Sequence, residues 1–170
     1  FIISLFYPQI VNTFTCKCGY ISYSFEKIID IPLLLNEEKE TSLESLIDNY
    51  FTEENFKWES KCDNCKQKEI HNKSTRIINL PNVLIFSLQR INERLHIKNN
   101  SVVSFKEEIN IKKYCDDSIS YKESGYSLFG ISNHCGSIDF GHYFANCKIN
   151  GQWYEFNDSN VRAESSIKLN

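Results

Sequence analysis

The 170-residue sequence contains no methionine, and it lacks a basic excess, a long apolar run and a secretory signal. Because Met is missing even at position 1, we expect the chain to begin inside a longer protein. A formal net charge of -3 excludes the basic surface that nucleic-acid binding requires. Pro8 interrupts the apolar start well short of the roughly 20 residues of a membrane span. No basic n-region or cleavage site marks a secretory signal, so we expect neither nucleic acid nor a membrane as partner.

The composition is that of a folded protein with a single core. Hydrophobic residues make up 41% of the chain, aromatic residues 14% and charged residues 24%, which predicts little disorder outside a few loops. The seven cysteines are an odd number, and four of them form two close pairs that suit a metal better than a disulfide framework. We therefore expect a reducing, intracellular compartment, the cytoplasm, the nucleus or both.

The first third of the chain predicts strands followed by one helix. Apolar and polar residues alternate between positions 21 and 26, which is typical of a strand. From Thr41 the apolar period becomes helical, and Thr41 and Glu44 have the spacing of a capping box. We predict one amphipathic helix over roughly Ser42–Phe51.

Strand patterns return in the rest of the chain. The run from Val83 to Phe86 is wholly apolar and predicts a strand buried on both faces. Asn150-Gly151, between two alternating runs, is the strongest short signal for a β-hairpin. The predicted strands lie within Ser74–Leu80, Asn82–Ile91, Val102–Ile111, Tyr126–Ser132 and Tyr143–Phe156.

Two cysteine pairs predict a structural zinc site. Cys16-Lys17-Cys18-Gly19 and Cys62-Asp63-Asn64-Cys65 are short knuckles, and four thiolates from two such knuckles can hold zinc in a closed tetrahedron. The alternative is four reduced surface thiols. Isolated cysteines are more often buried small hydrophobes than nucleophiles, and three stand alone: Cys115, Cys135 and Cys147.

A histidine-containing segment carries the strongest functional signal. Leu128–Lys148, followed by Gly151–Ser159, resembles the histidine box of the ubiquitin-specific proteases. Asn82–Arg90 resembles the central palm strand of that family, and the two cysteine pairs resemble the zinc ribbon of its fingers. The resemblance extends from Leu5 to Val161.

The resemblance implies a hand-shaped, papain-like α+β fold with a mostly antiparallel palm and fingers. Residues 1–170 would then form a partial catalytic domain with most of the helical thumb missing, residues 10–75 forming the zinc-ribbon fingers and residues 76–165 the palm. The family hydrolyses the bond after the C-terminal glycine of ubiquitin, so ubiquitin and ubiquitinated proteins are the expected partners. The cysteine box of the family matches nothing in this sequence, so we expect the nucleophile to come from an upstream segment.

By resemblance, His142 is the general base of this thiol protease. A thiol that attacks an isopeptide carbonyl needs an imidazole to take its proton and a third group to orient that imidazole. Asn157 and Asp158 are the candidates for the third group. If Asn150-Gly151 is a two-residue turn, strand parity places His142 opposite Ser159, so Asn157 shares its face and Asp158 does not. The same parity makes Cys147 a core residue.

The remaining expectations concern the groove for the ubiquitin tail. By resemblance, the loops Asn133–Gly141 and Ile91–Asn100 rim this groove, and the tail-binding residues are His134, Gly141 and Tyr143. His134 could instead only hydrogen-bond a loop. The other two histidines, His71 and His96, are expected to have no partner.

A noncatalytic ubiquitin-binding relative that acts as a scaffold is the main alternative function. The presence of both His142 and Asn157 argues against it, because an inactive relative need not keep both. A zinc-ribbon nucleic-acid binder is excluded because no stripe of Lys and Arg accompanies the cysteines.

Overall fold

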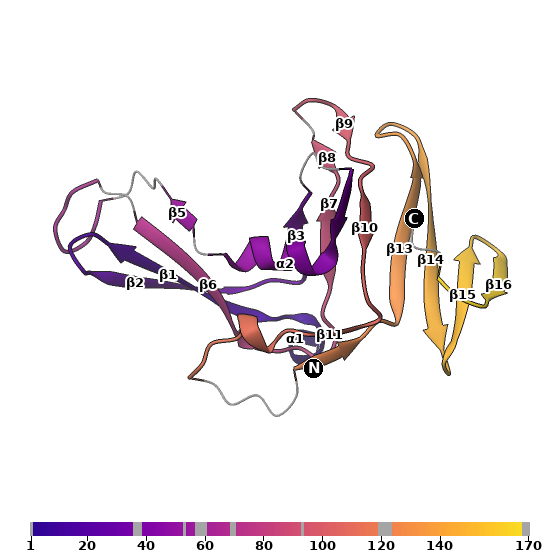
Figure 1. The fold of residues 1–170 in the computed structure, drawn as a ribbon, viewed down its shortest axis with the longest axis horizontal. Helices are drawn as coiled ribbons and strands as arrows, with labels where there is room; N and C mark the ends of the chain where they lie inside the picture. Colours follow the sequence, from indigo (N-terminus) through magenta and orange to yellow (C-terminus); the bar gives the residue numbers. More distant parts are fainter. Residues whose placement is uncertain are drawn as a thin grey trace. The chain divides into compact units, whose positions relative to one another are not determined.

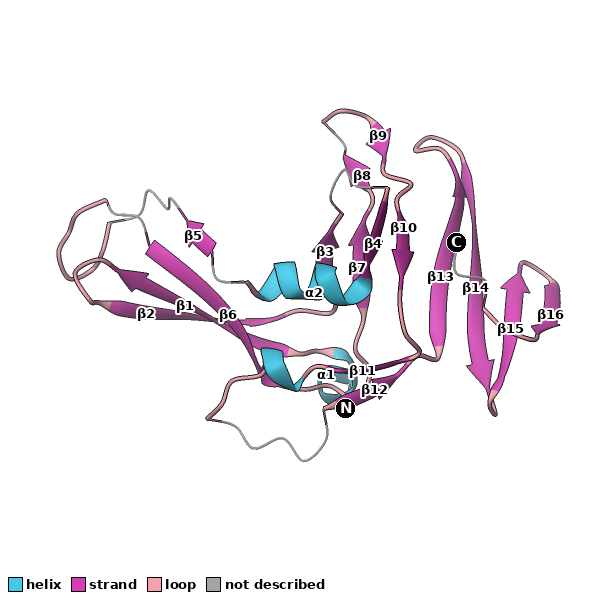
Figure 2. Ribbon diagram, in the orientation of Figure 1, coloured by secondary structure: helices cyan, strands magenta, loops and turns pink. Residues whose placement is uncertain are grey.

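The computed structural model describes residues 2–35, 39–52, 54–56, 61–68, 71–92, 94–118 and 124–167. Within them, short antiparallel strands predominate and α-helices are few (Figure 2), as expected for the α+β class. The chain forms two compact units. The first comprises Phe1–Leu33, Ile47–Ser87 and Asn110–Gly125, and the second comprises Leu34–Leu46, Leu88–Ile109 and Tyr126–Asn170.

The first unit is built on an antiparallel sheet with the strand order β2-β1-β6-β5, in which β1 and β6 lie side by side (Figure 1). Its strands are β1 (Gln9–Cys16), β2 (Ile21–Lys27), β5 (Glu54–Phe56) and β6 (His71–Asn79). Ile10 and Ile77 are register partners and both are buried. Next to them, the buried Thr75 hydroxyl donates a hydrogen bond to Asn12 Oδ1 at 2.7 Å, which satisfies two polar groups inside the core.

The apolar run Val83–Phe86 is not a doubly buried strand, contrary to our prediction. Strand β7 (Phe86–Gln89) begins only at Phe86, and Ile85 is 37% exposed. The chain bends directly after Pro81, and the backbone N–H of Val83 donates to Leu5 O instead of a sheet neighbour. The bend therefore delays the strand, which then pairs with β3 (Ile31–Leu34).

Helix α2 (Leu43–Phe51) lies where the apolar period predicts it, but its cap differs from the prediction. Ser42, not Thr41, caps it, because the backbone N–H of Ser45 donates to Ser42 Oγ at 3.1 Å. Thr41 belongs to β4 (Glu40–Ser42), which pairs in parallel with β10 (Val102–Ser104). Strand pairing keeps Thr41 extended, so the helix starts one residue later.

The second unit contains a four-stranded antiparallel sheet with the order β13-β14-β15-β16, drawn in orange to yellow in Figure 1. Its strands are β13 (Gly130–Gly136), β14 (Gly141–Ile149), β15 (Gln152–Asn157) and β16 (Asn160–Glu164). The predicted hairpin is confirmed: Ile149 pairs with Gln152 across Asn150 (φ 50°) and Gly151 (φ 83°). Two consecutive positive φ values are the signature of a type I′ turn, which sets the register of β14 and β15.

A small hairpin in the same unit is anchored by an arginine. It consists of β8 (Ile91–Asn92) and β9 (Ile97–Lys98). The Arg90 guanidinium donates to the carbonyl oxygens of Asn99 at 3.1 Å and Ser101 at 2.8 Å, so one side chain closes the base of the hairpin.

The remaining elements are short. The predicted strand Val102–Ile111 is two strands, β10 and β11 (Glu108–Asn110), because a bend interrupts the strand at residues 105–107. The region Tyr126–Ser132 is likewise divided between β12 (Gly125–Ser127) and β13. The other short elements are the helix α1 (Ile2–Phe6) and the 3-10 helix η1 (Lys112–Tyr114). Among the described residues, no helix is long and apolar enough to cross a membrane.

Candidate functional site: a histidine–asparagine pair and a four-cysteine centre

The side chains of His142 and Asn157, both in the second unit, are joined by a hydrogen bond. Nε2 of His142 lies 2.6 Å from Oδ1 of Asn157. An amide oxygen only accepts hydrogen bonds, so Nε2 must carry the proton and donate it. In the neutral ring Nδ1 then keeps a free lone pair, which is the form that an imidazole needs to take a proton from a thiol. The side chain of His142 is 47% exposed, so a reacting group can reach it.

Asp158 lies farther from the imidazole than Asn157. Its Oδ2 is 3.9 Å from His142 Nε2, and its side chain is 78% exposed. Asp158 occupies the left-handed conformation at φ 53° in the turn between β15 and β16. An ion pair this exposed is worth about 0–1 kcal/mol, so Asp158 can only assist a protonated His142 weakly.

Strand parity correctly predicts that Asn157 contacts His142, but the extrapolated pairing of His142 with Ser159 is wrong. The pairing of β14 with β15 ends at Ala145 and Phe156. Beyond it the chain turns tightly, so that Asn157 pairs with Asn160 instead. Asn157 therefore reaches His142 from the end of its strand.

The residues predicted to bind the ubiquitin tail include both chain neighbours of His142. His134 pairs with Tyr143 across β13 and β14, and their ring centroids are 4.5 Å apart. A Cβ atom added at Gly141 would lie 1.9 Å from His134 Nε2. Only glycine therefore fits beneath this imidazole, and the structure brings His134 together with Gly141 and Tyr143, the two chain neighbours of His142.

Two side chains of the β8–β9 hairpin reach the segment that carries His134. Lys98 Nζ lies 2.9 Å from His134 Nδ1 and 2.8 Å from the carbonyl oxygen of Gly136. His96 Nε2 lies 3.1 Å from Asp139 Oδ2. The expectation that His96 has no partner is wrong, because the fold brings together residues 43 positions apart; the side chain of His71 lies outside the described residues.

Sequence reasoning missed Lys98 and Asp139. Lys98 lies 36 residues before its partner His134. No local sequence motif contains both residues, so the sequence does not indicate that they are in contact. The one available signal was that the loops Ile91–Asn100 and Asn133–Gly141 were expected to rim the same groove.

The isolated cysteines differ in their surroundings. Cys115 is buried, and burial raises the pKa of its thiol to about 11, so it stays protonated at neutral pH. Cys135 is exposed. Cys147 is only half-buried and is not the core residue that parity predicts, because the opposite face, with Asn146 and Trp153, is the one that the second unit buries.

The four paired cysteines converge in the first unit. The Sγ atoms of Cys16, Cys18, Cys62 and Cys65 all lie within 4.8 Å of one another. Two of the sulfur–sulfur distances are 3.9 Å (Cys16–Cys65) and 3.7 Å (Cys18–Cys62). Tetrahedral zinc with Zn–S bonds of about 2.3 Å requires sulfurs about 3.8 Å apart. The donor set therefore fits a closed four-thiolate metal site.

Backbone geometry and charge at this cluster also suit a metal. Positive φ at Gly19 (85°) and Lys66 (61°) closes the two knuckles. The pKa of the Cys18 thiol is lowered to about 6, chiefly by a hydrogen bond from the Tyr20 backbone. At Cys16 the hydrogen bond from the Cys18 backbone lowers the pKa, but burial and three neighbouring thiols together outweigh it and raise the pKa to about 12. Ionising the other thiols beside Cys18 therefore requires a nearby cation, which a bound metal would supply.

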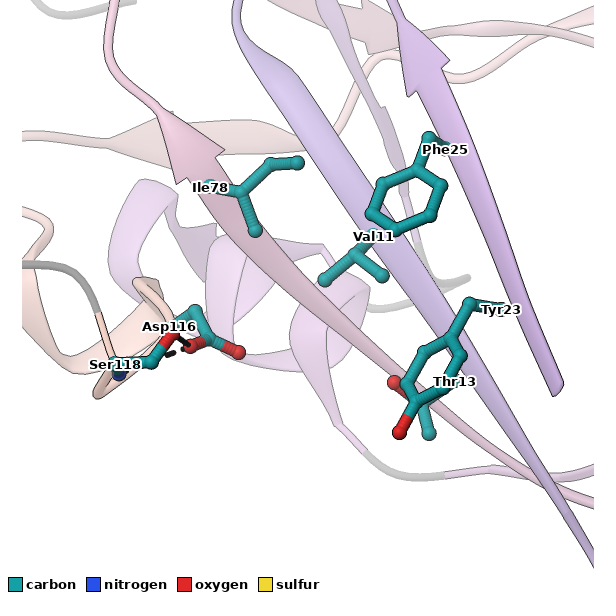
Figure 3. A pocket seen from close by; sticks show the side chains of 7 residues that line it. All are labelled: Val11, Thr13, Tyr23, Phe25, Ile78, Asp116 and Ser118. Carbon is teal, nitrogen blue, oxygen red and sulfur yellow. Dashed lines mark hydrogen bonds between the residues drawn. The ribbon is translucent and has the colours of Figure 1, made fainter. Parts of the chain in front are cut away.

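A surface hollow on the first unit lacks catalytic groups. Figure 3 shows its lining: Val11, Thr13, Tyr23, Phe25, Ile78, Asp116 and Ser118. The side chains of Tyr23 and Phe25 are exposed, and Ser118 hydrogen-bonds Asp116. With no thiol or imidazole in its lining, this hollow does not extend the chemistry described above.

Comparison with proteins of known sequence gives a consistent result. The chain is 34% identical over 165 residues to ubiquitin carboxyl-terminal hydrolase Usp2 of Drosophila melanogaster, covering 92% of this chain and 17% of the fly protein. It is 31% identical over 178 residues to ubiquitin carboxyl-terminal hydrolase 21 of Rattus norvegicus, covering 99% of this chain and 31% of the rat protein. The chain thus spans less than a third of each of these relatives.

Solved structures and a family model agree with these relatives. The SAGA DUB module Ubp8/Sgf11/Sus1/Sgf73 bound to ubiquitin aldehyde matches with a TM-score of 0.82 and 29% identity, over 97% of this chain and 39% of that chain. This likeness confirms the α+β fold expected from the resemblance. The family model described as ubiquitin carboxyl-terminal hydrolase matches residues 6–169. The chain therefore belongs to the ubiquitin carboxyl-terminal hydrolase family.

Proposed function

We propose that this chain provides the general-base half of a deubiquitinating cysteine protease. The complete protein would hydrolyse the peptide or isopeptide bond after the C-terminal glycine of ubiquitin, with a nucleophilic cysteine supplied by a segment outside this sequence. The observation that carries the proposal is the 2.6 Å contact between His142 Nε2 and Asn157 Oδ1, which leaves His142 Nδ1 free to activate a thiol.

The proposed reaction assigns a role to each group. His142 Nδ1 takes the proton of the incoming thiol as its sulfur attacks the carbonyl carbon, and the resulting imidazolium returns this proton to the leaving amine. Asn157 holds the ring in the tautomer that this requires. Asp158, at 3.9 Å, adds a weak favourable charge while the ring is cationic. Water then hydrolyses the thioester, which regenerates the thiol and releases the ubiquitin carboxylate.

Ubiquitin and ubiquitinated proteins are the proposed partners. One structural relative is the SAGA DUB module bound to monoubiquitin, which matches with a TM-score of 0.82 at 30% identity over 95% of this chain and 37% of that chain. We assign the ubiquitin tail to the surface formed by His134, Gly141 and Tyr143. In this proposal the exposed ring of Tyr143 contacts an extended peptide beside His142.

We assign the four-cysteine centre to structural zinc, held by Cys16, Cys18, Cys62 and Cys65. Four thiolates occupy every position of a tetrahedral ion, so bound zinc would brace the two knuckles and leave no site for substrate. In this proposal residues 10–75 form zinc-ribbon fingers, and residues 76–165 form a palm that carries the histidine box.

The test of the proposed function uses the full-length protein that contains this chain. Wild type should release a fluorophore from the C-terminus of ubiquitin, and His142→Ala should lower kcat by at least about a thousandfold, as for other members of catalytic triads. An unchanged unfolding midpoint would show that His142→Ala still folds. Full activity in His142→Ala would contradict the assignment, and ubiquitin binding without hydrolysis by wild type would favour the scaffold alternative.

A further inference from the structure

Lys98 contacts the β13–β14 segment at three places. Besides His134 Nδ1 at 2.9 Å and Gly136 O at 2.8 Å, its ammonium lies 3.2 Å from the carbonyl oxygen of His134. A lysine ammonium has three donors and no acceptor. The three contacts therefore account for all its protons, and His134 Nδ1 must accept one of them.

The tautomer of His134 follows from this contact. Because Nδ1 accepts from Lys98, the neutral ring carries its proton on Nε2. This Nε2 is the atom that lies against Gly141, only 1.9 Å from where a Cβ atom would stand. The His134 ring also contacts the Tyr143 ring, and their centroids are 4.5 Å apart. His134 is thus oriented by Lys98 and contacts both chain neighbours of His142.

The hairpin that carries Lys98 is itself held in place by hydrogen bonds. Lys98 is the last residue of β9, and Arg90 closes the base of that hairpin through the Asn99 and Ser101 carbonyl groups. The Lys98 side chain is only partly exposed. A second link, between His96 and Asp139 at 3.1 Å, joins the same two loops nearer their tips, but both side chains are more than half exposed. Lys98 therefore makes the less exposed of the two links.

We propose that Lys98 and His134 are positioning residues for the general base, an inference that rests on the proposed function of His142. Lys98 fixes the orientation and tautomer of His134, and the His134 ring fixes the backbone at Gly141 and Tyr143, on either side of His142. Lys98 and His134 thus fix the backbone position from which the His142 side chain extends, while Asn157 fixes the orientation of its imidazole. A displacement of about 1 Å in a reacting group can cost a hundredfold in rate, so this backbone contact matters for turnover.

The test compares variants of the full-length protein. Lys98→Met keeps the length of the side chain and removes the ammonium, and His134→Phe keeps a ring against Gly141 but removes the acceptor. Each should lower kcat by roughly ten- to a hundredfold. Lys98→Met, which leaves the tail-binding ring of His134 in place, should also keep KM for a ubiquitin substrate within about threefold. The double variant should be much less impaired than the product of the two single effects, because Lys98 acts through His134. Lys112→Met removes a more exposed lysine charge in the other unit and should retain wild-type kinetics.

A measurement independent of activity decides whether the contact exists. In full-length protein with 15N-labelled histidine, the His134 ring of wild type should show protonated Nε2 and unprotonated Nδ1, and Lys98→Met should lose this preference. An Nδ1-protonated ring in wild type would overturn the inference. A change in KM alone in Lys98→Met, or fully multiplicative effects of the two variants, would also overturn it. If the full-length protein lacks hydrolase activity, the proposed function fails, while the tautomer result still tests the contact between Lys98 and His134.

Discussion

His142 Nε2 lies 2.6 Å from Asn157 Oδ1, whereas the carboxylate of the adjoining Asp158 lies 3.9 Å away. Asn157 and Asp158 could each orient an imidazole in principle, but only Asn157 lies within hydrogen-bond distance of the His142 ring. Asn157 stands at the end of β15 and points toward His142, while Asp158 occupies an exposed turn. A neutral amide thus orients the ring, and the charged group stays in solvent.

The first prediction follows from this separation and concerns turnover by the full-length protein. Asn157→Ala removes the acceptor of the Nε2 proton and should lower kcat roughly 10- to 100-fold, because a hydrogen bond to an ionising group is worth about 1.5–3 kcal/mol. Asp158→Asn removes the charge but tolerates positive φ, and it should change kcat by at most about fivefold. Steady-state kinetics with a ubiquitin substrate measure both. A larger loss in Asp158→Asn than in Asn157→Ala would reverse the assignment.

The second prediction concerns the 170-residue chain expressed alone. It should not cleave ubiquitin conjugates, because in our proposal its thiols include no partner for His142, and Cys115 is protonated at a pKa of about 11. Incubation with a fluorogenic ubiquitin substrate under reducing conditions checks this. Turnover that disappears in Cys135→Ser, the exposed thiol paired across β13 and β14 with His142, would show that the chain carries its own nucleophile.

The third prediction concerns the metal. Protein purified under reducing conditions should contain about one equivalent of zinc. Cys65→Ser, which removes one ligand, should lower the metal content, and the loss of several kcal/mol of binding energy should lower the unfolding midpoint by on the order of 10 °C. Cys147→Ser is the matched control, since this half-buried thiol lies in the other unit. Metal-free wild type with four titratable thiols at the cluster would contradict the assignment.

The fourth prediction concerns the turn that sets the β14–β15 register. A Cβ atom at Gly151 meets nothing within 4 Å, so the cost of Gly151→Ala arises from its φ of 83° alone. Left-handed backbone costs an alanine about 1–2 kcal/mol, which corresponds to a midpoint lower by roughly 2–8 °C. Gly130 has equal space and no positive φ, so Gly130→Ala should be neutral or slightly stabilising. Equal effects of the two substitutions on thermal unfolding would show that the turn is not conformationally demanding.

The fifth prediction concerns acid stability of the first unit. Asp48 accepts hydrogen bonds from Lys113 Nζ at 2.6 Å and Tyr114 Oη at 2.9 Å. The bond from Lys113 is the main reason that the pKa of Asp48 falls below its ordinary value of 3.8. A carboxyl whose pKa is lower in the folded state stabilises the protein above its unfolded pKa, and this contribution disappears as pH falls through the folded-state pKa.

The corresponding experiment is thermal unfolding of wild type and Asp48→Asn between pH 7 and pH 2. Because Asp48 is half exposed, the substitution should cost about 1 kcal/mol or less at pH 7. The difference between the two proteins should shrink as pH falls below about 4. A difference that stays constant down to pH 2 would show that the Asp48 carboxylate contributes nothing specific.

Local features of the chain could be predicted from the sequence because their physical causes are local. Asn150-Gly151 adopts positive φ with little strain, so the hairpin and its register follow from two residues. The two close cysteine pairs are likewise visible in the sequence as knuckles, although their convergence into one cluster joins residues 44 and 49 positions apart. Hairpin parity even places Asn157 on the side of His142, because alternation along a strand needs no knowledge of the rest of the fold.

Other features depend on contacts between distant segments, and these only the tertiary structure decides. The partner of Lys98 lies 36 residues away and that of His96 lies 43 residues away, so no local pattern links them. Pairing of β4 with β10 keeps Thr41 extended and transfers the cap to Ser42. The tight turn after Asn157 ends the pairing of β14 with β15, so His142 does not lie opposite Ser159 as strand parity predicts. Local preferences are worth about 1 kcal/mol per residue, so strand pairing and long-range hydrogen bonds override them wherever the two conflict.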